Sequence, residues 1–141
     1  MGFLDDVQEP FAVPGDQEYK IRLVDVRTGI NKSGNPYLLP VFEIPDEPTA
    51  KEFTKYLGLP HEGMSPKQLN SRGWTMKSFC HAMDIDVGMF EDYVETFINN
   101  PEADPPDNSF MIGADGWAIL GLEESDQWGE QNYVKKFVVP K

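Results

Sequence analysis

The chain has 141 residues, 40% of them hydrophobic and 12% aromatic, which is enough to bury the core of one domain but too few for two. Its 24 acidic and 12 basic residues give a net charge of -12, which disfavours a polyanionic partner for the protein as a whole. A single cysteine excludes an internal disulfide, and no apolar run approaches the roughly 20 residues that cross a bilayer. The first six residues hold no basic leader, so we expect a soluble protein of the cytoplasm with no membrane partner.

The basic residues lie in two blocks, which run from Lys20 to Lys77 and from Lys135 to Lys141. The intervening stretch 84–130 holds thirteen carboxylates and not one Lys or Arg. Within 20–77, nine basic residues outnumber six acidic ones, so a local surplus of positive charge survives inside an acidic protein. We therefore expect a polarised surface, part of which is able to contact phosphates.

The first predicted elements are an arm and a hairpin. Residues 1–14 carry two prolines and three acidic residues without hydrophobic periodicity, which predicts an extended N-terminal arm. A strand is expected over 19–27, and its apolar face shifts by one residue after Leu23, which predicts a bulge or a sharp coil. Turn-forming residues fill 28–36 and predict a hairpin loop, and a second strand follows over Tyr37–Ile44.

Pro40 inside the second strand predicts a sheet edge or a bulge at that point. After an acidic turn, a third strand is expected over Lys51–Leu57, and the first three strands then form a meander. Alternation assigns the residues of this third strand to two faces, with Phe53, Lys55 and Leu57 opposite Glu52, Thr54 and Tyr56.

The pattern then changes to helix. Ser65-Pro66-Lys67-Gln68 places a capping serine before a proline at the first helical position, with a glutamine three residues after the cap. Two apolar stripes at helical spacing follow, namely Met76, Phe79, Cys80 and Met83, and then Phe90, Tyr93, Val94 and Phe97. We expect two or three helices between residues 65 and 98, and a surface loop over the proline-rich and acidic stretch 99–108.

The last third returns to two strands, over Gly116–Glu123 and Asn132–Val139, joined by the loop Ser125–Glu130. Five strands with helices between the third and the fourth follow the chain order of the OB-fold, a partly open Greek-key barrel that binds oligonucleotides or sugars. The expected fold is therefore mainly β with a helical insertion (α+β). It is a single five-stranded OB-fold domain over 15–141, with its helices at about 65–98.

The order of several short motifs points to one protein family. These motifs are Tyr19-Lys20-Ile21, Asn31-Lys32-Ser33-Gly34-Asn35-Pro36, Val41-Phe42-Glu43-Ile44, a helical segment 79–85, Gly121–Glu124 and Gly129–Phe137. Over residues 15–140 the chain resembles the small OB-fold single-stranded DNA-binding proteins encoded by bacteriophages. The resemblance implies a non-enzymatic protein that binds and protects single-stranded DNA in phage replication or recombination, in the host cytoplasm. It does not extend to the acidic tail of many phage and bacterial members, since this sequence ends with Val139-Pro140-Lys141.

Binding a single strand without sequence preference requires cations for the phosphates and aromatic rings for the bases. The predicted phosphate contacts are Lys20, Arg22, Arg27, Lys32, Lys51, Lys55, Lys135 and Lys136, and the predicted stacking residues are Tyr37, Trp128 and Tyr133. The alternative for each lysine is to solvate an outer strand face, and for Trp128 it is a ring folded back onto the end of the barrel. Trp74 and Trp117 are assigned to the core.

No catalytic or metal site is expected. His61 and His81 have no partner arrangement of Ser, Cys or Asp near them in sequence, so a nucleophilic triad has no support. Asp84 and Asp86 stand between two predicted helices, where capping is favoured over metal binding. We therefore expect no enzymatic activity, no required metal and no cofactor.

The acidic block 84–130 leaves other functions open. It is first of all a solvated face, but it also offers a surface for replication or recombination proteins. One alternative function is an acidic protein-interaction or DNA-mimic inhibitory protein, which the net charge favours and the basic surplus in 20–77 opposes. A third is a virion structural component. An oligomer is compatible with the sequence, and so is RNA in place of DNA.

Overall fold

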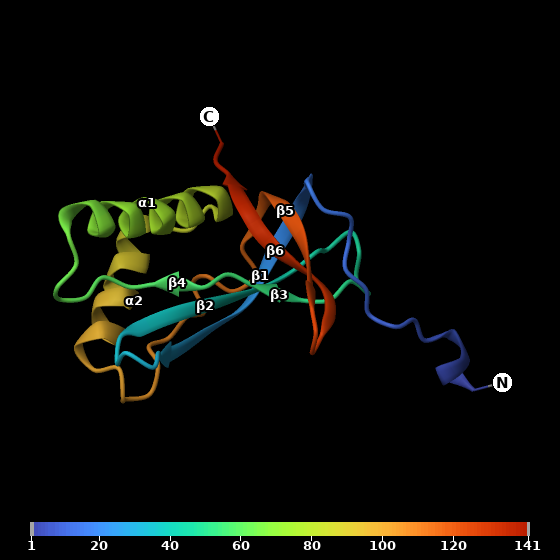
Figure 1. Ribbon diagram of the computed structural model, residues 1–141, viewed down its shortest axis with the longest axis horizontal. Coiled ribbons are helices and arrows are strands. Elements are labelled where there is room, and N and C mark those ends of the chain that lie inside the picture. The colour runs from blue at the N-terminus through green and yellow to red at the C-terminus, as the bar shows by residue number, and fades with distance from the viewer. Residues whose placement is uncertain (1, 141) are drawn as a thin grey trace.

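The computed structural model of the protein describes residues 2–140, in which strands come first, two helices follow and two strands end the chain (Figure 1). The elements are, in chain order, the 3-10 helix η1 (Phe3–Asp6), strands β1 (Gln17–Ile30), β2 (Pro36–Glu43), β3 (Phe53–Thr54) and β4 (Leu57–Gly58), helices α1 (Pro66–Met83) and α2 (Val87–Asn99), and strands β5 (Asp115–Ser125) and β6 (Gly129–Val138). The fold is mainly β with two helices inserted between strands, as the sequence predicts. Within residues 2–140, no helix combines the length and the apolar character needed to cross a membrane.

All six strands belong to one antiparallel sheet, whose order is β3-β2-β1-β5-β6, with β4 pairing with β2 beside β3. The predicted third strand is thus two short strands. In the described part of the chain, the edge strands β3 and β6 share no ladder of hydrogen bonds. The sheet is therefore not closed, and the five-stranded OB-fold barrel is not confirmed.

The shift of face predicted in the first strand is a β-bulge. Leu23 pairs with Phe42, whereas Asp25 pairs with Val41, so Val24 is the extra residue. The first part of β1 pairs with β5 and its second part with β2, and the bulge lies just after the point where one partner gives way to the other. Because a bulge bends and twists a strand, it allows β1 to serve both halves of a curled sheet.

Pro40 explains why the third strand is interrupted. Its carbonyl accepts a hydrogen bond from Lys55 N (3.1 Å), and in an antiparallel strand the N and O atoms of one residue point to the same side. The nitrogen of Pro40 therefore faces the segment between β3 and β4, and it has no hydrogen to donate. The prediction of a sheet edge or a bulge at Pro40 is wrong, because β2 is an inner strand. The interruption lies in the neighbouring strand, between β3 and β4.

The two helices begin and end where the sequence indicates. Ser65 Oγ accepts a hydrogen bond from Gln68 N (3.2 Å), while Gln68 Oε1 accepts one from Ser65 N (2.9 Å). Helix α1 ends at Asp84, whose φ of 55° lies in the left-handed region. Asp86 Oδ1 accepts from Met89 N (2.9 Å) at the start of α2. Both aspartates therefore cap helices, as predicted.

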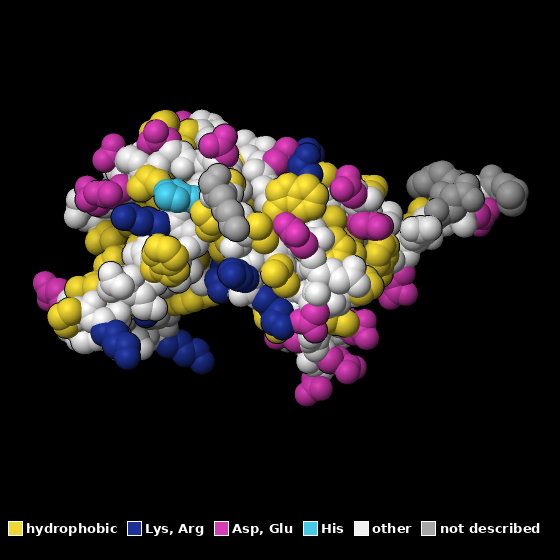
Figure 2. Space-filling view, turned by 90° about the horizontal axis from the view of Figure 1, so that it is seen from above, with side chains coloured by type: hydrophobic (Ala, Val, Ile, Leu, Met, Phe, Trp, Pro, Cys, Tyr) yellow, Lys and Arg dark blue, Asp and Glu magenta, His cyan; other side chains and the backbone are white. Residues whose placement is uncertain are grey.

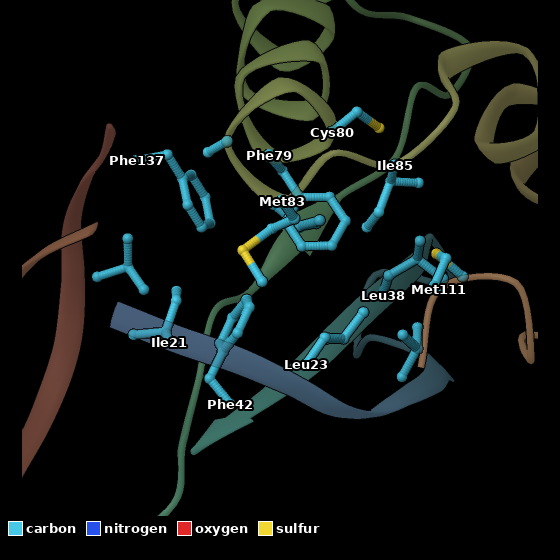
Figure 3. Close-up of a cluster of buried hydrophobic side chains, with 14 of the residues drawn as sticks. Ile21, Leu23, Leu38, Phe42, Phe79, Cys80, Met83, Ile85, Met111 and Phe137 are labelled. Carbon is cyan, nitrogen blue, oxygen red and sulfur yellow. The ribbon is translucent and has the colours of Figure 1, made fainter. Parts of the chain in front are cut away.

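An aromatic cluster fills the space between α1 and the strands β2 and β6 (Figure 3). Phe42 of β2, Phe79 of α1 and Phe137 of β6 are all buried. The ring centroid of Phe42 lies 6.1 Å from each of the other two, which are 5.6 Å apart. Such aromatic pairs contribute about 0.5–1.5 kcal/mol each beyond the area they bury. The cluster thus joins two strands that share no hydrogen bonds.

Two tryptophans assigned to the core lie on the surface instead. Trp74 on α1 is 70% exposed, and Trp117 on β5 is 48% exposed. Trp74 precedes the buried Phe79 by five residues, which turns it about 140° around the helix from the buried stripe. On β5, Gly116 and Ala118 are the buried neighbours, so strand alternation places Trp117 on the outer face.

The predicted arm 1–14 is bound to the domain at its C-terminal end. The buried side chain of Asn132 accepts a hydrogen bond from Val13 N (2.9 Å) and donates one to Val13 O (2.9 Å). Phe11 O accepts from Lys51 N (2.8 Å), just before β3. Thr49 Oγ1 donates a hydrogen bond to Gln8 Oε1 (3.2 Å), and the described residues before Gln8 extend away from the domain (Figure 1).

Gly116 lies where β5 passes against the end of α1. A Cβ at this position would lie 2.7 Å from Met83 Sδ and closer still to Ala82 O. We expect Gly116→Ala to lower the free energy of unfolding by about 1–3 kcal/mol, measured by chemical denaturation, because a helix backbone has to move aside.

Gly73→Ala on α1 is the matched control. A Cβ at Gly73 meets no atom within 4 Å, so this substitution is expected to be neutral or to stabilise the helix by up to about 1 kcal/mol. Equal effects of the two substitutions would contradict the close packing of α1 on β5.

Candidate nucleic-acid interface

The eleven residues predicted to contact nucleic acid are distributed over four parts of the surface. These parts are the end of β1 and its loop to β2 (Arg27, Lys32, Tyr37), the outer face of β1 (Lys20, Arg22), the surroundings of the β5–β6 turn (Lys51, Trp128), and β6 with the segment facing it (Lys55, Tyr133, Lys135, Lys136). These four parts differ in how many of their Lys and Arg side chains form ion pairs or hydrogen bonds within the protein.

Tyr37 and Tyr56 form an aromatic pair on the outer face of the sheet, with ring centroids 4.9 Å apart and planes inclined by 27°. Tyr37 covers Gly29 on the neighbouring strand, where a Cβ would lie 2.5 Å from Cζ of the tyrosine ring. Tyr56 is 49% exposed.

Arg27, which pairs with Leu39 two residues along β2 from Tyr37, is exposed, and so is Lys32 in the loop after β1. Arg27 Nε lies 3.7 Å from Asp25 Oδ2, so its charge is partly paired. We term Arg27, Lys32, Tyr37 and Tyr56 together the tyrosine face.

Asn31 organises the loop between β1 and β2. Its side-chain oxygen accepts hydrogen bonds from Ser33 N and Asn35 N, both at 3.0 Å. Its side-chain nitrogen donates to the Tyr56 hydroxyl (3.2 Å). The loop that carries Lys32 is therefore connected directly to the aromatic pair.

The sequence-based prediction did not include Tyr56. Strand alternation had already placed Tyr56 on the face opposite Phe53, and this was the available signal. The stacking partner Tyr37 lies on a different strand, and the two rings meet because β2 pairs with β4. That pairing is not visible in a local pattern.

Carboxylates neutralise the two basic residues on the outer face of β1. Arg22 Nε donates to Asp115 Oδ1 (2.8 Å), and Arg22 Nη1 lies 3.7 Å from Glu43 Oε1. Lys20 Nζ lies 4.0 Å from Asp115 Oδ2. The hydrogen bond to Asp115 and its charge raise the pKa of Arg22 above the usual value. Two cations facing two carboxylates leave this face close to neutral, which weakens its attraction for phosphates.

Lys51 links the two edges of the sheet. Its ammonium donates hydrogen bonds to Trp128 O (3.1 Å) and Glu130 O (3.0 Å). Trp128 ends the three-residue turn between Ser125 and Gly129, and its indole is 62% exposed. The ring is thus not folded back onto the end of the sheet, while the Lys51 ammonium is engaged with the turn.

The tyrosine face and the Trp128 turn lie at opposite ends of β2. Tyr37 is near the start of β2 and pairs with β4, whereas Phe42 near its end pairs with β3, which closely follows Lys51. Five residues of extended strand separate these ends, or about 17 Å. Two aromatic contact points at that separation fit an extended ligand.

Three of the residues predicted to contact nucleic acid lie close together on β6, namely Tyr133, Lys135 and Lys136. Tyr133 packs over Gly121, where a Cβ would lie 2.6 Å from the tyrosine hydroxyl, so its ring covers the sheet. Lys135 forms an ion pair with Asp16, and this hydrogen bond raises the pKa of Lys135. Lys136 is exposed and forms no ion pair with any of the carboxylates whose side chains are described.

Lys55 lies between β3 and β4 and lines a groove that runs between β6 and α1. Trp74 of α1 and Lys136 of β6 line the same groove. We term it the β6–α1 groove, and its lining includes Lys55, Trp74, Thr75, Ser78, Lys136 and Val139. Sequence reasoning had selected its lysines but had placed its tryptophan in the core.

Figure 2 shows one face of the polarised surface that the charge blocks predict. Lys and Arg side chains lie in its central and lower left parts among exposed hydrophobic side chains, while Asp and Glu predominate along the upper edge and on the right. The β5–β6 hairpin itself exposes Glu123, Glu124, Asp126 and Glu130. Trp128 therefore combines an exposed ring with negative surroundings, which disfavour an approaching phosphate.

Comparison with models of protein families gave no match, and comparison with curated proteins gave none. Within residues 2–140, no group of three or more His, Cys, Asp or Glu side chains is arranged to hold a metal ion. The functional interpretation therefore depends on the residues and the geometry of this chain.

Lys51→Met removes the ammonium that bonds the Trp128 turn and keeps most of the aliphatic stem. We expect a loss of about 1–2 kcal/mol in the free energy of unfolding, because two hydrogen bonds to carbonyl oxygens disappear. Faster amide hydrogen exchange confined to 126–130, measured by mass spectrometry, is expected as well. Lys32→Met is the control, and unchanged exchange in the Lys51 variant would show that the bridge does not hold the turn.

Proposed function

We propose that the protein binds and protects single-stranded DNA without catalysing a reaction, through Lys and Arg contacts to phosphates and stacking of bases on exposed rings. The observation that carries this proposal is the tyrosine face, where the stacked pair Tyr37–Tyr56 lies near Arg27 and Lys32. Because every base has a π-face, binding of this kind has little sequence preference. The proposed setting is replication or recombination of a phage genome in the host cytoplasm.

The topology supports the proposal, because the order and pairing of the strands are those expected of a partly open OB-fold barrel. Strands β1, β2 and β3/β4 form a meander, β1 also pairs with β5, and both helices come between β4 and β5. In an OB-fold, ligands bind on the face of the second and third strands and at the 1-2 and 4-5 loops. The tyrosine face matches the first two surfaces, and the Trp128 turn matches the third.

The aromatic pair favours a single strand over a duplex. A net charge of -12 works against any long polyanion, so affinity has to come from a local surface. Stacked bases inside a duplex are not accessible to Tyr37 and Tyr56, whereas the bases of a single strand are. We therefore infer that single-stranded DNA binds more tightly than duplex DNA of the same length.

Titration with oligo(dT) and with duplex DNA, each at two salt concentrations, tests the proposal. Oligo(dT) is expected to quench tryptophan fluorescence and to bind more weakly as salt rises, because phosphate contacts release counterions. Absence of both quenching and a gel shift at low salt would overturn the proposal. An acidic interaction or inhibitory protein, or a virion component, would then be the remaining functions.

Tyr56→Ala is expected to weaken oligo(dT) binding by about 1–3 kcal/mol, since the substitution removes one stacking ring. The exposed position predicts only a small change in thermal stability. Tyr56→Phe is the matched control, because it keeps the ring and loses only the hydrogen bond from Asn31. Equal loss of affinity in the two variants would assign the effect to the hydroxyl and not to stacking.

A further inference from the structure

The β6–α1 groove contains the most exposed tryptophan side chain of the described residues. Trp74 projects from α1 away from the buried stripe and is more exposed than Trp117 or Trp128. Burial of an aromatic side chain removes roughly 150–250 Å² from water. A tryptophan that remains exposed therefore does not contribute the free energy of this burial to folding. Its position at a groove indicates a contact surface.

The groove is positively charged. Lys55 and Lys136 line it from two different segments of the chain, and neither forms an ion pair with a carboxylate whose side chain the structure describes. Lys135 also lines it but is paired with Asp16, and Glu18 is the one acidic side chain among the described lining residues. In a protein with a net charge of -12, such a local surplus of cations is where a polyanion is least repelled.

A second hollow connects the groove to the tyrosine face. It is lined by Lys55, Tyr56, Arg72 and Thr75, between the β3–β4 segment and α1, and it shares Lys55 and Thr75 with the groove. Lys55 and Tyr56 are adjacent in the chain and both line this hollow. A strand that lies on Tyr56 can therefore continue over this segment to Trp74.

We infer that the β6–α1 groove is a second contact site for the same single strand, in which a base stacks on Trp74 while Lys55 and Lys136 bind neighbouring phosphates. The inference rests on the proposed function and extends the path of the strand from the outer face of the sheet to α1. Short oligonucleotides then occupy the tyrosine face alone, and longer ones also reach Trp74.

The chemistry of the groove favours a nucleic-acid strand over a protein segment. A hollow suited to an apolar partner lies between α1 and α2, where Met76, Phe90, Val94 and Ile98 form much of the lining. The β6–α1 groove instead combines cations with a ring open to stacking, as surfaces for single strands do. An acidic peptide matches the charge but leaves Trp74 without a stacking partner.

Trp74→Ala, measured with oligo(dT) of about 4 and about 16 nucleotides, tests the second site. We expect affinity for the longer oligonucleotide to fall about 10-fold or more, while affinity for the shorter one stays within about 2-fold of wild type. Thermal stability is expected to be unchanged, because the side chain is exposed. Leu69→Ala is the matched control, since Leu69 is exposed on α1 outside the groove.

A double substitution, Lys55→Gln with Lys136→Gln, tests the phosphate contacts independently. With the longer oligonucleotide, we expect the slope of log K against log salt to decrease in magnitude by about 1.4, because each lost phosphate contact removes about 0.7. Lys67→Gln, at an exposed position on α1 outside the groove, is expected to leave the slope unchanged.

The outcomes separate the two proposals. Affinity of Trp74→Ala equal to that of wild type for both lengths would overturn the second site and leave the proposed function intact. Equal weakening for both lengths would also overturn it, because Trp74 would then belong to the first contact. Failure of the wild-type protein to bind either oligonucleotide would overturn both proposals. Trp74-dependent binding of poly-glutamate without binding of oligo(dT) would assign the groove to an acidic protein partner.

Discussion

The packing of Phe42, Phe79 and Phe137 is the contact on which the rest of the structure depends. Hydrogen bonds hold each strand of the sheet to its neighbours, but in the described residues they do not join β3 to β6. The three rings bring α1 against the inner strand β2 and the edge strand β6, and Phe42 also stacks on Phe53 of the other edge strand, β3, with ring centroids 5.6 Å apart. Apolar burial therefore replaces the ladder that closes a complete barrel. Lys51 adds a polar bridge at one end of the same gap, through the carbonyls of the β5–β6 turn.

The open edge also explains where the exposed aromatic and basic side chains lie. Pro40 interrupts the third strand, and the short segment between β3 and β4 sends Tyr56 to the outer face and Lys55 toward α1. Trp74 and Lys136 both line the β6–α1 groove, beside the edge of β6 that has no strand partner in the described residues.

A large excess of acidic residues is compatible with a basic contact surface, because the two kinds of charge are separated in space. Asp115 and Glu43 neutralise the cations on the outer face of β1, whereas Lys55 and Lys136 have no such partner among the described residues. Exposed charges more than about 8 Å apart are largely screened at physiological ionic strength. The local arrangement of charge, and not the net charge, therefore decides which ligand the surface can hold.

Local patterns in the sequence determined the elements of this protein, because a capping box at Ser65 or a shift of face after Leu23 involves residues only a few positions apart. They also placed the helices between strands and selected the three lysines that line the groove, Lys55, Lys135 and Lys136. They failed for Trp74, since exposure depends on what packs against a helix and not on the character of the side chain. The stacking of Tyr37 on Tyr56 depends on a strand ladder between residues distant in the chain. Only the tertiary structure decided that Lys20 and Arg22 are neutralised by Asp115, because this carboxylate lies on β5, which the sequence does not show to be a neighbour of β1.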